Sequence, residues 1–484
     1  MEIPKEAESA IKKLKKAGFE AYIVGGCVRD FLREKEPEDW DITTSARPKE
    51  IQKIFPRSFY ENKFLTVTVQ TGSRDPKTKE LEITTYRSET KYTDKRHPDQ
   101  IKFAKTLKED LARRDFTVNA LAMDISGKII DPFAGQKDLK NKIIRTVGKP
   151  EERFSEDALR MMRAVRFTTT LNSGWEVEAN TAKAIKKNAF WLQAISKERI
   201  KEELIKIIMS ERAAQGIETL RKVGLLKYII PELEEGYGIS QNKHHIYECY
   251  EHYLRSLDYA AKQNFNKYVR LAALFHDIGK PKTKRGEGAN ATFYNHEIVS
   301  AKMTFRVLSR LKFSKKDIEK VAKLVRYHLF YYNVDEVGES SVRRLVRQVG
   351  PENMEELMQL RMCDRIGSGV PKAEPYKLRH LRYIIEKVAQ DPISVKTLKV
   401  SGSGVMKILG IEPGPKVGQI LNVLLGCVLE DPKKNKKEFL EKEIKKLGKL
   451  SDKKLLELSQ KAKKEREKLE IKRDEMTKKK YWVT

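Results

Sequence analysis

The chain has 484 residues, too many for one ordinary hydrophobic core, so we expect about two to four domains. Its formal net charge is +29, which favours a polyanionic partner such as RNA, unless it only reflects a lysine-rich composition. No apolar run reaches the roughly 20 residues of a membrane span, and the amino-terminal segment lacks the apolar stretch of a signal peptide. Four scattered cysteines without a CxxC pair indicate reduced thiols. We therefore expect a cytoplasmic protein of several domains without membrane spans.

The first 142 residues alternate between helical and strand patterns. Residues 6–16 have the apolar spacing of an amphipathic helix, and residues 21–24 form a short apolar strand. Alternating, β-branched residues predict two further strands at 64–70 and 81–86, joined by a polar, turn-rich loop. A second polar segment, 91–100, contains Pro98 and predicts a mobile loop. These patterns predict a small mixed α+β head.

From about residue 143 the pattern is almost wholly helical. Ser155 is a suitable N-cap for a helix over 156–168. The last part, 431–484, is rich in lysine, which predicts either a long solvated helix or a partly disordered basic arm. We divide the chain into four predicted parts: a head (1–142), a helical neck (143–225), a helical block that carries most histidines (226–390) and a helical, Lys-rich tail (391–484).

Two aspartates stand at alternate positions of a segment that we expect to be extended. Asp39 and Asp41 would then point to the same face, within reach of a shared pair of hard cations. Mg²⁺ prefers oxygen ligands, and two such ions support in-line phosphoryl or nucleotidyl transfer. Upstream, Gly25 and Gly26 allow the backbone to approach a phosphate closely. An isolated Asp-x-Asp pair is more often a solvated strand edge, but the preceding GGCVRD segment makes the pattern more specific.

The segment IVGGCVRDFLREKEPEDWDITT, residues 23–44, resembles the opening of the bacterial-type (class II) tRNA nucleotidyltransferases. This family contains the CCA-adding enzymes and the closely related poly(A) polymerases. Four further segments follow in the family's order: RRDFTVNA at 113–120, DPFAGQKDL at 131–139, EDALR at 156–160 and ERI at 198–200. The resemblance is dense over residues 3–225 and continues into the histidine-bearing block and the helical tail.

The resemblance implies a template-independent enzyme that adds C and A residues to tRNA 3′ ends from CTP and ATP. It implies an α+β fold, in which a small mixed-sheet head like that of DNA polymerase β precedes a mostly α-helical body, an HD domain and a tail. Asp39 and Asp41 would be catalytic ligands of two Mg²⁺ ions. Glu82 would be a third catalytic carboxylate, or else an ordinary exposed strand residue.

The resemblance also implies a nucleotide site around these carboxylates. Arg29 would help the two glycines cradle the phosphates, although it could instead be the structural partner of Asp30. Arg113 and Arg114 would meet phosphates or form a surface ion-pair patch, and Asp115 would accept a hydrogen bond from the ribose 2′-hydroxyl. The full predicted nucleotide-binding set is Gly25, Gly26, Arg29, Arg113, Arg114, Asp115, Asn119, Glu156, Asp157, Arg160 and Arg163.

Base choice without a template would come from the EDALR segment. Asp157 and Arg160 are three residues apart and would share one face of a helix. A carboxylate acceptor beside a guanidinium donor suits the hydrogen-bonding edge of C or A and penalises G and U. By resemblance, Glu156, Asp157 and Arg160 are the protein template, and the plain alternative is a surface salt bridge. By resemblance, the loop at 89–103 favours full CCA addition, or addition of A alone, over CC alone, because family members that add only CC lack a flexible loop at this place.

Most of the eight histidines lie between residues 244 and 328. The segment HDIGKP at 276–281 resembles the core of the HD phosphohydrolase superfamily. The predicted metal ligands of this HD site are His252, His276, Asp277, His296, His328 and Asp364. Such ligands suit Mn²⁺, Ni²⁺, Fe²⁺ or Mg²⁺, and a metal-bound water could attack a phosphate ester. By resemblance, the role would be phosphatase or 2′,3′-cyclic phosphodiesterase trimming of tRNA ends, although an HD pair alone is often structural.

Several alternatives remain open at this point. An A-adding enzyme or a poly(A) polymerase would carry the same head motifs. A mainly hydrolytic HD enzyme would use the head only to bind RNA, and a non-catalytic RNA-binding protein is disfavoured by the intact aspartate pair. The favoured interpretation has tRNA, CTP and ATP as partners, with the basic body holding RNA through its phosphates. The sequence does not indicate an oligomeric state.

Overall fold

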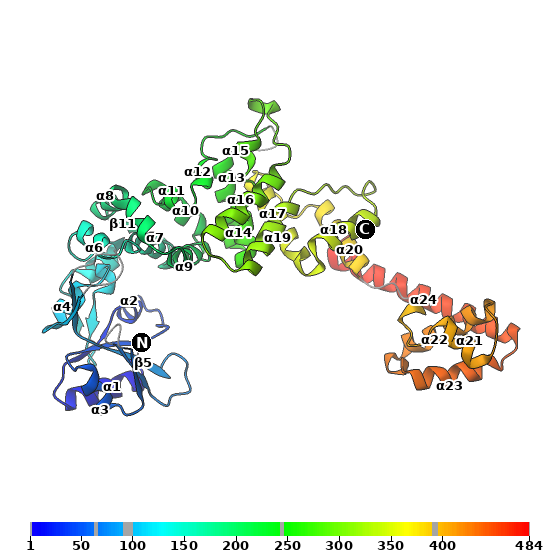
Figure 1. Ribbon diagram of the computed structural model, residues 1–484, viewed down its shortest axis with the longest axis horizontal. Coiled ribbons are helices and arrows are strands. Elements are labelled where there is room, and N and C mark those ends of the chain that lie inside the picture. Colours follow the sequence, from blue (N-terminus) through cyan, green and yellow to red (C-terminus); the bar gives the residue numbers. More distant parts are fainter. Residues whose placement is uncertain (1, 62–65, 91–99, 243–245, 390–394, 484) are drawn as a thin grey trace. The chain divides into compact units, whose positions relative to one another are not determined.

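The computed structural model describes residues 2–61, 66–90, 100–242, 246–389 and 395–483. The chain divides into two compact units (Figure 1). One unit contains Met1–Leu329 and Gln359–Pro371, and the other contains Phe330–Met358 and Lys372–Thr484. The finer division into four parts stays a prediction. No helix in the described ranges is long and apolar enough to cross a membrane.

A seven-stranded sheet forms the centre of the head, in the order β3-β4-β5-β2-β1-β8-β9. The strands are β1 (Ala21–Val24), β2 (Asp41–Thr44), β3 (Ser58–Glu61), β4 (Thr66–Gln70), β5 (Glu80–Thr85), β8 (Ala122–Met123) and β9 (Ile129–Ile130). Neighbouring strands are antiparallel except β2 and β5, which are parallel. The predicted mixed sheet is therefore confirmed, and the three strands that were expected from sequence correspond to β1, β4 and β5.

Two helices cover the apolar core of this sheet. They are α1 (Lys5–Lys16) and α3 (Pro48–Ile54), and α1 buries Ile11 and Leu14. Trp40 belongs to the same core and is 4% exposed. Asp39 and Asp41 flank Trp40, so the alternation of an extended chain directs their side chains away from the core. Asp41 is the first residue of β2, whereas Asp39 lies in the bend before the strand.

The remaining elements of the head surround the carboxylate strand. They are the helices α2 (Gly26–Leu32), α4 (Leu107–Ala112) and α5 (Gly135–Asn141), the turn η1 (Thr117–Asn119), and a separate hairpin of β6 (Arg87–Thr90) and β7 (Gln100–Phe103). The predicted mobile loop at 91–100 falls almost entirely between these two strands, at residues 91–99, which lie outside the described residues. Of that segment only Gln100 is described, and it begins β7.

The neck is helical as expected, but its first helix is interrupted. The structure has α6 (Pro150–Glu156) and α7 (Arg160–Thr170), with an extended residue, Asp157, between them. The predicted single helix over 156–168 with Ser155 as its N-cap is therefore wrong, because Ser155 lies inside α6. The following elements are α8 (Ala179–Asn188), η2 (Ala189–Ala194), α9 (Lys197–Ile208) and α10 (Ala213–Lys222), and the short strands β10 (Ile143–Ile144) and β11 (Glu176–Val177) pair in parallel.

A bundle of helices surrounds the histidines. Its elements are α11 (Leu226–Ile229), α12 (Pro231–Glu234), α13 (Cys249–Lys262), α14 (Lys267–Phe275), α15 (Lys280–Thr283), η3 (Gly288–Asn290), α16 (His296–Arg310), α17 (Lys315–Tyr327) and α19 (Met354–Gly367). The helices α13, α14, α16 and α17 pack against one another in pairs. The core of this bundle includes the fully buried Phe275 and Leu324.

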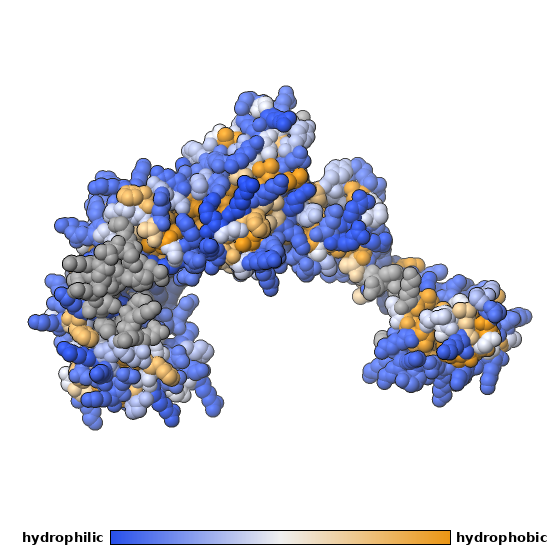
Figure 2. All heavy atoms as spheres, viewed as in Figure 1, coloured by the Kyte–Doolittle hydropathy of each residue, from blue (hydrophilic) through white to orange (hydrophobic). Residues whose placement is uncertain are grey.

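The second unit is helical throughout its described residues. Its elements are α18 (Glu339–Val349), η4 (Pro351–Asn353), α20 (Tyr376–Ala389), η5 (Val395–Thr397), α21 (Gly402–Leu409), α22 (Pro415–Glu430), η6 (Pro432–Lys434), α23 (Lys437–Gly448) and α24 (Asp452–Tyr481). The helices α21 to α24 share one apolar core, and α24 also packs on α20. Figure 2 shows apolar side chains at the surface over α21 and α22. Of the two structures that we expected for the Lys-rich end, the long helix is confirmed, because α24 spans 30 residues.

Candidate active site and histidine cluster

Three acidic residues gather at one edge of β2. The parallel register places Asp41 directly opposite Glu82 of β5, and Asp39 precedes Asp41 in an exposed bend. Burial, together with the charges of Asp39 and Glu82, raises the pKa of Asp41 to about 6, although Arg114 opposes the shift. The structure therefore brings together the three predicted catalytic carboxylates. The oxygens of these three carboxylates are less tightly clustered than the ligand atoms of two histidine-containing groups described below. Within each of those groups, the ligand atoms lie within 4.8 Å of one another.

A cavity of about 310 Å³ opens beside these carboxylates. Its walls are lined by Val24, Asp41, Thr66, Thr68, Glu82, Thr84, Arg87, Arg113 and Arg114. The lining thus combines two carboxylates with three arginines, and Arg114 lies near Asp41. Such a cavity fits a metal-bound triphosphate, because the carboxylates attract cations while the guanidinium groups attract phosphate oxygens.

The glycine pair lies next to this cavity. Gly25 has a φ of +88°, a conformation that side chains rarely adopt. A Cβ atom at Gly25 would lie 2.6 Å from Nη1 of Arg114 and 3.9 Å from Oδ2 of Asp41. A side chain here would therefore displace Arg114 from its position beside the carboxylate. Gly26 begins α2, and a Cβ there would be 3.6 Å from Nη2 of Arg29.

Arg29 is engaged within the protein. Its Nε and Nη2 donate to the two carboxylate oxygens of Asp30 at 3.0 and 2.6 Å, and its Nη1 donates to Oδ1 of Asn119 at 2.7 Å. Arg33 also pairs with Asp30 at 2.9 Å. The structure therefore contains the Arg29–Asp30 pair that was the structural alternative for Arg29. Its predicted contact with phosphates stays a prediction.

Asp115 connects the head to the neck through a buried carboxylate. Its Oδ1 accepts hydrogen bonds from the Phe116 N–H at 2.8 Å and from Nδ2 of Asn119 at 3.0 Å. Its Oδ2 accepts from Nε and Nη2 of Arg163 at 2.8 and 2.6 Å. A carboxylate accepts about four hydrogen bonds, so these contacts occupy its capacity. A hydrogen bond to a ribose hydroxyl would have to replace one of them.

The residues that the sequence predicts to select the base lie at the break between α6 and α7. Arg160 donates from Nη1 to Oε2 of Glu156 at 2.7 Å and from Nη2 to the carbonyl of Arg113 at 3.1 Å. Asp157 pairs instead with Arg199 of α9, whose Nη2 lies 2.7 Å from Oδ2. The expectation that Asp157 and Arg160 share a helix face is wrong, because the helix ends before Asp157. The extended conformation of Asp157 lets it reach across to a different helix.

Arg199 and Phe167 are two neighbours of this site that the sequence interpretation did not assign. Arg199 lies in the ERI segment, which was recognised only as a motif. Phe167 lies beneath three guanidinium groups, at 5.4, 5.5 and 4.0 Å from Arg29, Arg163 and Arg166 respectively. In the sequence, Phe167 directly follows the last of three arginines at three-residue spacing, Arg160, Arg163 and Arg166. That pattern was the available signal for such stacking.

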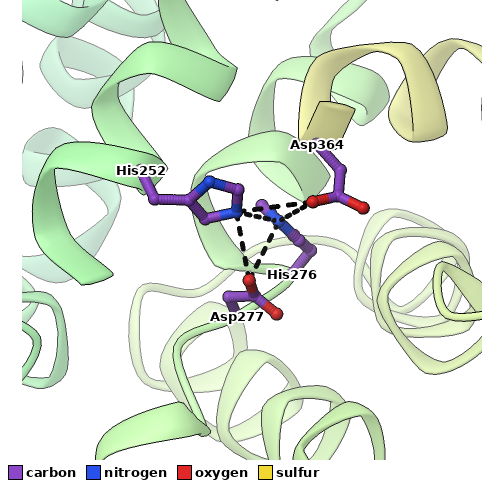
Figure 3. A group of neighbouring side chains, drawn as sticks. All are labelled: His252, His276, Asp277 and Asp364. Carbon is purple, nitrogen blue, oxygen red and sulfur yellow. Dashed lines mark hydrogen bonds and ion pairs between the residues drawn. The ribbon is translucent and has the colours of Figure 1, made fainter. Parts of the chain in front are cut away.

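The histidine cluster is fully assembled and buried. Nε2 of His252 lies 2.8 Å from Nε2 of His276 and 3.0 Å from Oδ2 of Asp277, and Asp364 approaches the two histidines at 3.5 and 3.6 Å (Figure 3). His252 comes from α13, Asp364 comes from α19, and the other two follow the end of α14. These four side chains point toward one another, which suits a shared cation.

A second group shares Asp277 on its other oxygen. Oδ1 of Asp277 lies 3.2 Å from Nε2 of His296 and 3.5 Å from Nε2 of His328. The Nδ1 atoms of these two rings bond the carbonyls of Phe293 and Val325, both at 2.7 Å, which directs Nε2 inward. All six predicted HD residues therefore meet in two overlapping ligand groups around one aspartate.

Lys280 is an unpredicted member of this cluster. Its Nζ lies 2.6 Å from Oδ2 of Asp277 and 2.6 Å from Oε1 of Gln241, and the side chain is buried. Burial would raise the pKa of Asp277, but Lys280 and His276 outweigh it and hold the pKa well below its usual range. This direction of the pKa shift favours the ionised carboxylate that a metal ligand requires.

Comparison with known families agrees with this organisation. Residues 21–145 match the poly A polymerase head domain, and residues 249–366 match the HD domain. Residues 174–236 match a family described as the probable RNA and SrmB-binding site of polymerase A. The first match contains the cavity with its carboxylates, and the HD match contains all six predicted ligands of the histidine cluster.

Curated relatives extend the likeness to most of the chain. A CCA-adding enzyme of Ligilactobacillus salivarius is 49% identical over 230 residues, an alignment that covers 46% of this chain and 54% of the relative, about half its length. A CCA-adding enzyme of Lactobacillus delbrueckii subsp. bulgaricus is 34% identical over 435 residues, which is 90% of this chain and 96% of the relative. That of Enterococcus faecalis is 33% identical over 448 residues, or 90% and 94%.

Solved structures carry the same likeness. The Bacillus stearothermophilus CCA-adding enzyme in complex with CTP is 29% identical, with a TM-score of 0.58 over 91% of this chain and 96% of that one. The Thermotoga maritima CCA-adding enzyme complexed with tRNA is 19% identical, with a TM-score of 0.50 over 91% and 94%, and shows the fold alone. Because full-length relatives exceed 30% identity along nearly their whole length, this chain belongs to the family of CCA-adding enzymes.

Proposed function

We propose that this chain adds C and A residues to the 3′ ends of tRNA, from CTP and ATP, by nucleotidyl transfer in the head. The observation that carries the proposal is the cavity that is lined by Asp41 and Glu82 together with Arg113 and Arg114. The relatives that align with about nine tenths of this chain are CCA-adding enzymes, which favours CCA addition over the A-adding and poly(A) alternatives. The net charge of +29 suits a tRNA partner held through its phosphates.

Asp39 and Asp41, with Glu82 beside them, have the chemistry to hold Mg²⁺. Hard cations prefer carboxylate oxygens. Burial and the charges of Asp39 and Glu82 raise the pKa of Asp41, so a bound cation would relieve this concentration of negative charge. When bound there, divalent cations would supply charge neutralisation at the triphosphate and at the attacking 3′-hydroxyl. The aspartates then fix where the reacting phosphorus lies relative to β2.

Two arginines of the cavity lining would orient the triphosphate. Arg113 and Arg114 follow one another at the end of α4, and both line the cavity. A guanidinium group binds phosphate oxygens with directed pairs of hydrogen bonds, and it stays charged at any working pH. Gly25 leaves the space that Arg114 occupies beside Asp41.

Selection of the base would use Asp157 and Arg160. A base that offers a donor beside an acceptor, as C and A do, pairs with a carboxylate and a guanidinium, whereas G and U present the opposite order. Glu156 orients Arg160 through a 2.7 Å hydrogen bond, and Arg199 holds Asp157 at 2.7 Å. The break between α6 and α7 thus presents one acceptor and one donor, each braced by a partner.

Product analysis tests this proposal directly. tRNA transcripts that end at the discriminator base, after the first C, after both C residues and after the complete CCA are incubated with Mg²⁺ and each labelled nucleotide separately. We expect C on the first two, A on the third and no addition to the last. Long A tails on unrelated RNA would instead identify a poly(A) polymerase, and incorporation of A alone would identify an A-adding enzyme.

A second candidate function is supported by the histidine cluster. Six buried ligands, with Asp277 shared between two groups, come together here, more than a structural HD pair requires. Imidazole and carboxylate ligands in this mixture suit Mn²⁺, Ni²⁺, Fe²⁺ or Mg²⁺. Such a centre, when loaded, supplies a bound water for hydrolysis of phosphate esters at RNA ends.

Metal content and hydrolysis test this second site independently of the head. We expect purified protein to bind Mn²⁺ or Ni²⁺ in calorimetry, to lose that binding in His276→Ala, and to open a 2′,3′-cyclic phosphate on a tRNA end. The matched control is His380→Ala, because His380 lies in the second unit and bonds Tyr332 instead. Equal metal binding by both variants would rule out the cluster as the metal site.

A further inference from the structure

We infer that Asp110 is a positioning residue of the head, which holds Arg113 and Arg114 in register with the carboxylate strand. This inference rests on the proposed nucleotidyl transfer. Asp110 lies in α4, and its side chain is fully buried, which is rare for a charged group without partners. It is not among the residues that line the cavity, so it would act only through the residues that it holds.

The carboxylate of Asp110 joins three separate elements. Its Oδ2 accepts a hydrogen bond from the hydroxyl of Thr43 in β2 at 3.1 Å. Its Oδ1 accepts from the backbone N–H of Arg87 at 3.3 Å, where the β6–β7 hairpin begins, and from Nε of Arg113 at 3.0 Å. Arg114 approaches Oδ2 at 4.0 Å. One buried anion therefore touches the acidic strand, the hairpin and both arginines.

The position of Thr43 makes this contact relevant to the carboxylates. Thr43 follows Asp41 by two residues in β2, so the two side chains lie on the same face of the strand. Thr43 is fully buried, and its hydroxyl bond to Asp110 sets the distance between β2 and α4. The strand that carries Asp41 and the helix that precedes the two arginines are thus joined by this bond.

The bond to Nε determines the direction of Arg113. A guanidinium is planar, so a hydrogen bond at Nε fixes the plane in which its outer nitrogens lie. Arg113 and Arg114 are adjacent cations in a confined space, and they repel each other unless an anion lies between them. Asp110 is that anion. Without the charge of Asp110, the two arginines would be held less firmly before the nucleotide binds. They would therefore bind the triphosphate less tightly.

The neighbouring Asp138 provides a matched control. It is also buried in the head, its Oδ2 accepts from the hydroxyl of Thr117 at 2.7 Å, and it pairs with Nε of Arg145 at 3.1 Å. The chemistry is therefore the same as at Asp110. However, Asp138, Thr117 and Arg145 do not line the cavity. Asp138→Asn therefore removes a buried charge of the same kind from a residue outside the cavity lining.

The test compares Asp110→Asn with Asp138→Asn in the full chain. The amide keeps the shape of Asp110 and removes its charge. We expect the KM values for CTP and ATP, and the Kd for CTP in calorimetry, to rise about tenfold in Asp110→Asn. The kcat and the KM for tRNA should stay within about threefold of the parent values, because the arginines would bind the triphosphate equally in the ground state and in the transition state. Asp138→Asn should change the melting temperature only.

A double-mutant cycle separates positioning from general stability. If Asp110 acts through Arg113, then Asp110→Asn in an Arg113→Gln background should raise the CTP Kd little further. Additive losses, or an unchanged Kd in the single variant, would overturn the inference. If Asp110→Asn does not fold, Thr43→Val replaces it, with an expected rise of about two- to threefold in the CTP Kd, and no rise overturns the inference. A parent chain that binds CTP without incorporating it refutes the proposed function instead.

Discussion

At the scale of single residues, the head holds like charges close together. Burial, Asp39 and Glu82 raise the pKa of Asp41 to about 6, and only Arg114 acts in the opposite direction. A fold that keeps ionised carboxylates close together is less stable than one that separates them. Residues in this state occur mostly where function requires them, because a bound cation removes the repulsion.

The first prediction concerns this acidic pair. Asp39→Ala combined with Asp41→Ala should lower incorporation of CTP about a thousandfold or more, because the cation site is lost. Affinity for tRNA, measured by filter binding, should change less than about twofold, since phosphate contacts elsewhere remain. Glu38→Ala is the local control, because Glu38 is an exposed carboxylate next to the pair. Incorporation that survives the double change would remove the metal assignment.

The second prediction concerns base selection. Arg160→Ala should raise misincorporation of UTP relative to CTP by about tenfold or more, because a lost directional donor changes discrimination by one to three kcal/mol. The KM for tRNA should stay near that of the parent. Arg306→Ala removes an exposed arginine of the same unit and serves as the control for charge. Competition between labelled CTP and UTP on a tRNA that lacks CCA measures the ratio, and an unchanged ratio contradicts the template role.

Sequence reasoning reached these residues to different degrees. The two aspartates can be found from spacing, because alternation along a strand is a local property. Their proximity to Glu82 depends on the parallel pairing of β2 with β5, which no local pattern encodes. Asp110 was missed for a similar reason, since its partners Thr43 and Arg87 come from other elements. For Arg29 the sequence left a phosphate contact and a pairing with Asp30 open, and the structure contains the pairing with Asp30, together with a bond to Asn119 that was not expected.

At the scale of elements, the break between α6 and α7 is decided by distant contacts. Residues 156–160 contain neither proline nor glycine, so local propensity predicts a continuous helix. In the structure, Arg153 donates to the carbonyl of Ala112 at 3.1 Å, and Arg160 donates to that of Arg113. Arg199 draws Asp157 away from the helix. The bonds from Arg153 and Arg160 join the neck to the end of α4. Together with the Arg199–Asp157 pair, they outweigh the few tenths of a kcal/mol per residue that helix propensity supplies.

The third prediction tests the link between the segment after α4 and α7. Burial would raise the pKa of Asp115, but Arg163, Asn119 and Arg160 outweigh it and hold the pKa far below its usual range. The stabilisation is therefore present above the unfolded-state pKa of about 3.9 and is lost as pH falls below it. Asp115→Asn should cost about 1–3 kcal/mol at pH 7, a value reduced because Arg163 is partly exposed.

Thermal unfolding at several pH values measures this effect. The difference in melting temperature between Asp115→Asn and the parent should be largest at neutral pH and should shrink below about pH 4. Asp75→Asn, at an exposed loop position of the head, should match the parent throughout. A difference that does not depend on pH would show that the charge of Asp115 does not stabilise the junction.

At the scale of the whole molecule, positive charge is spread far beyond the head. The second unit ends in α24, whose 30 residues keep most side chains exposed and include many lysines. A solvated helix of this kind presents cations at a spacing that suits a phosphate backbone, and it recognises shape rather than sequence. The sequence pattern could not decide between a helix and a disordered arm, because both are polar. The packing of α24 on α20 and α22 decided it.

The last prediction concerns the salt dependence of tRNA binding. Replacing Lys461, Lys463 and Lys464 of α24 with glutamine should weaken binding of tRNA several-fold, because each lost phosphate contact removes its released counterions. The plot of log affinity against log salt should become less steep, by about 0.7–0.9 per contact. Replacing Lys5, Lys12 and Lys16 of α1 changes the net charge equally at exposed positions of the head. Equal losses in both triple variants would indicate a general effect of net charge, whereas a loss confined to α24 would place tRNA phosphates on that helix.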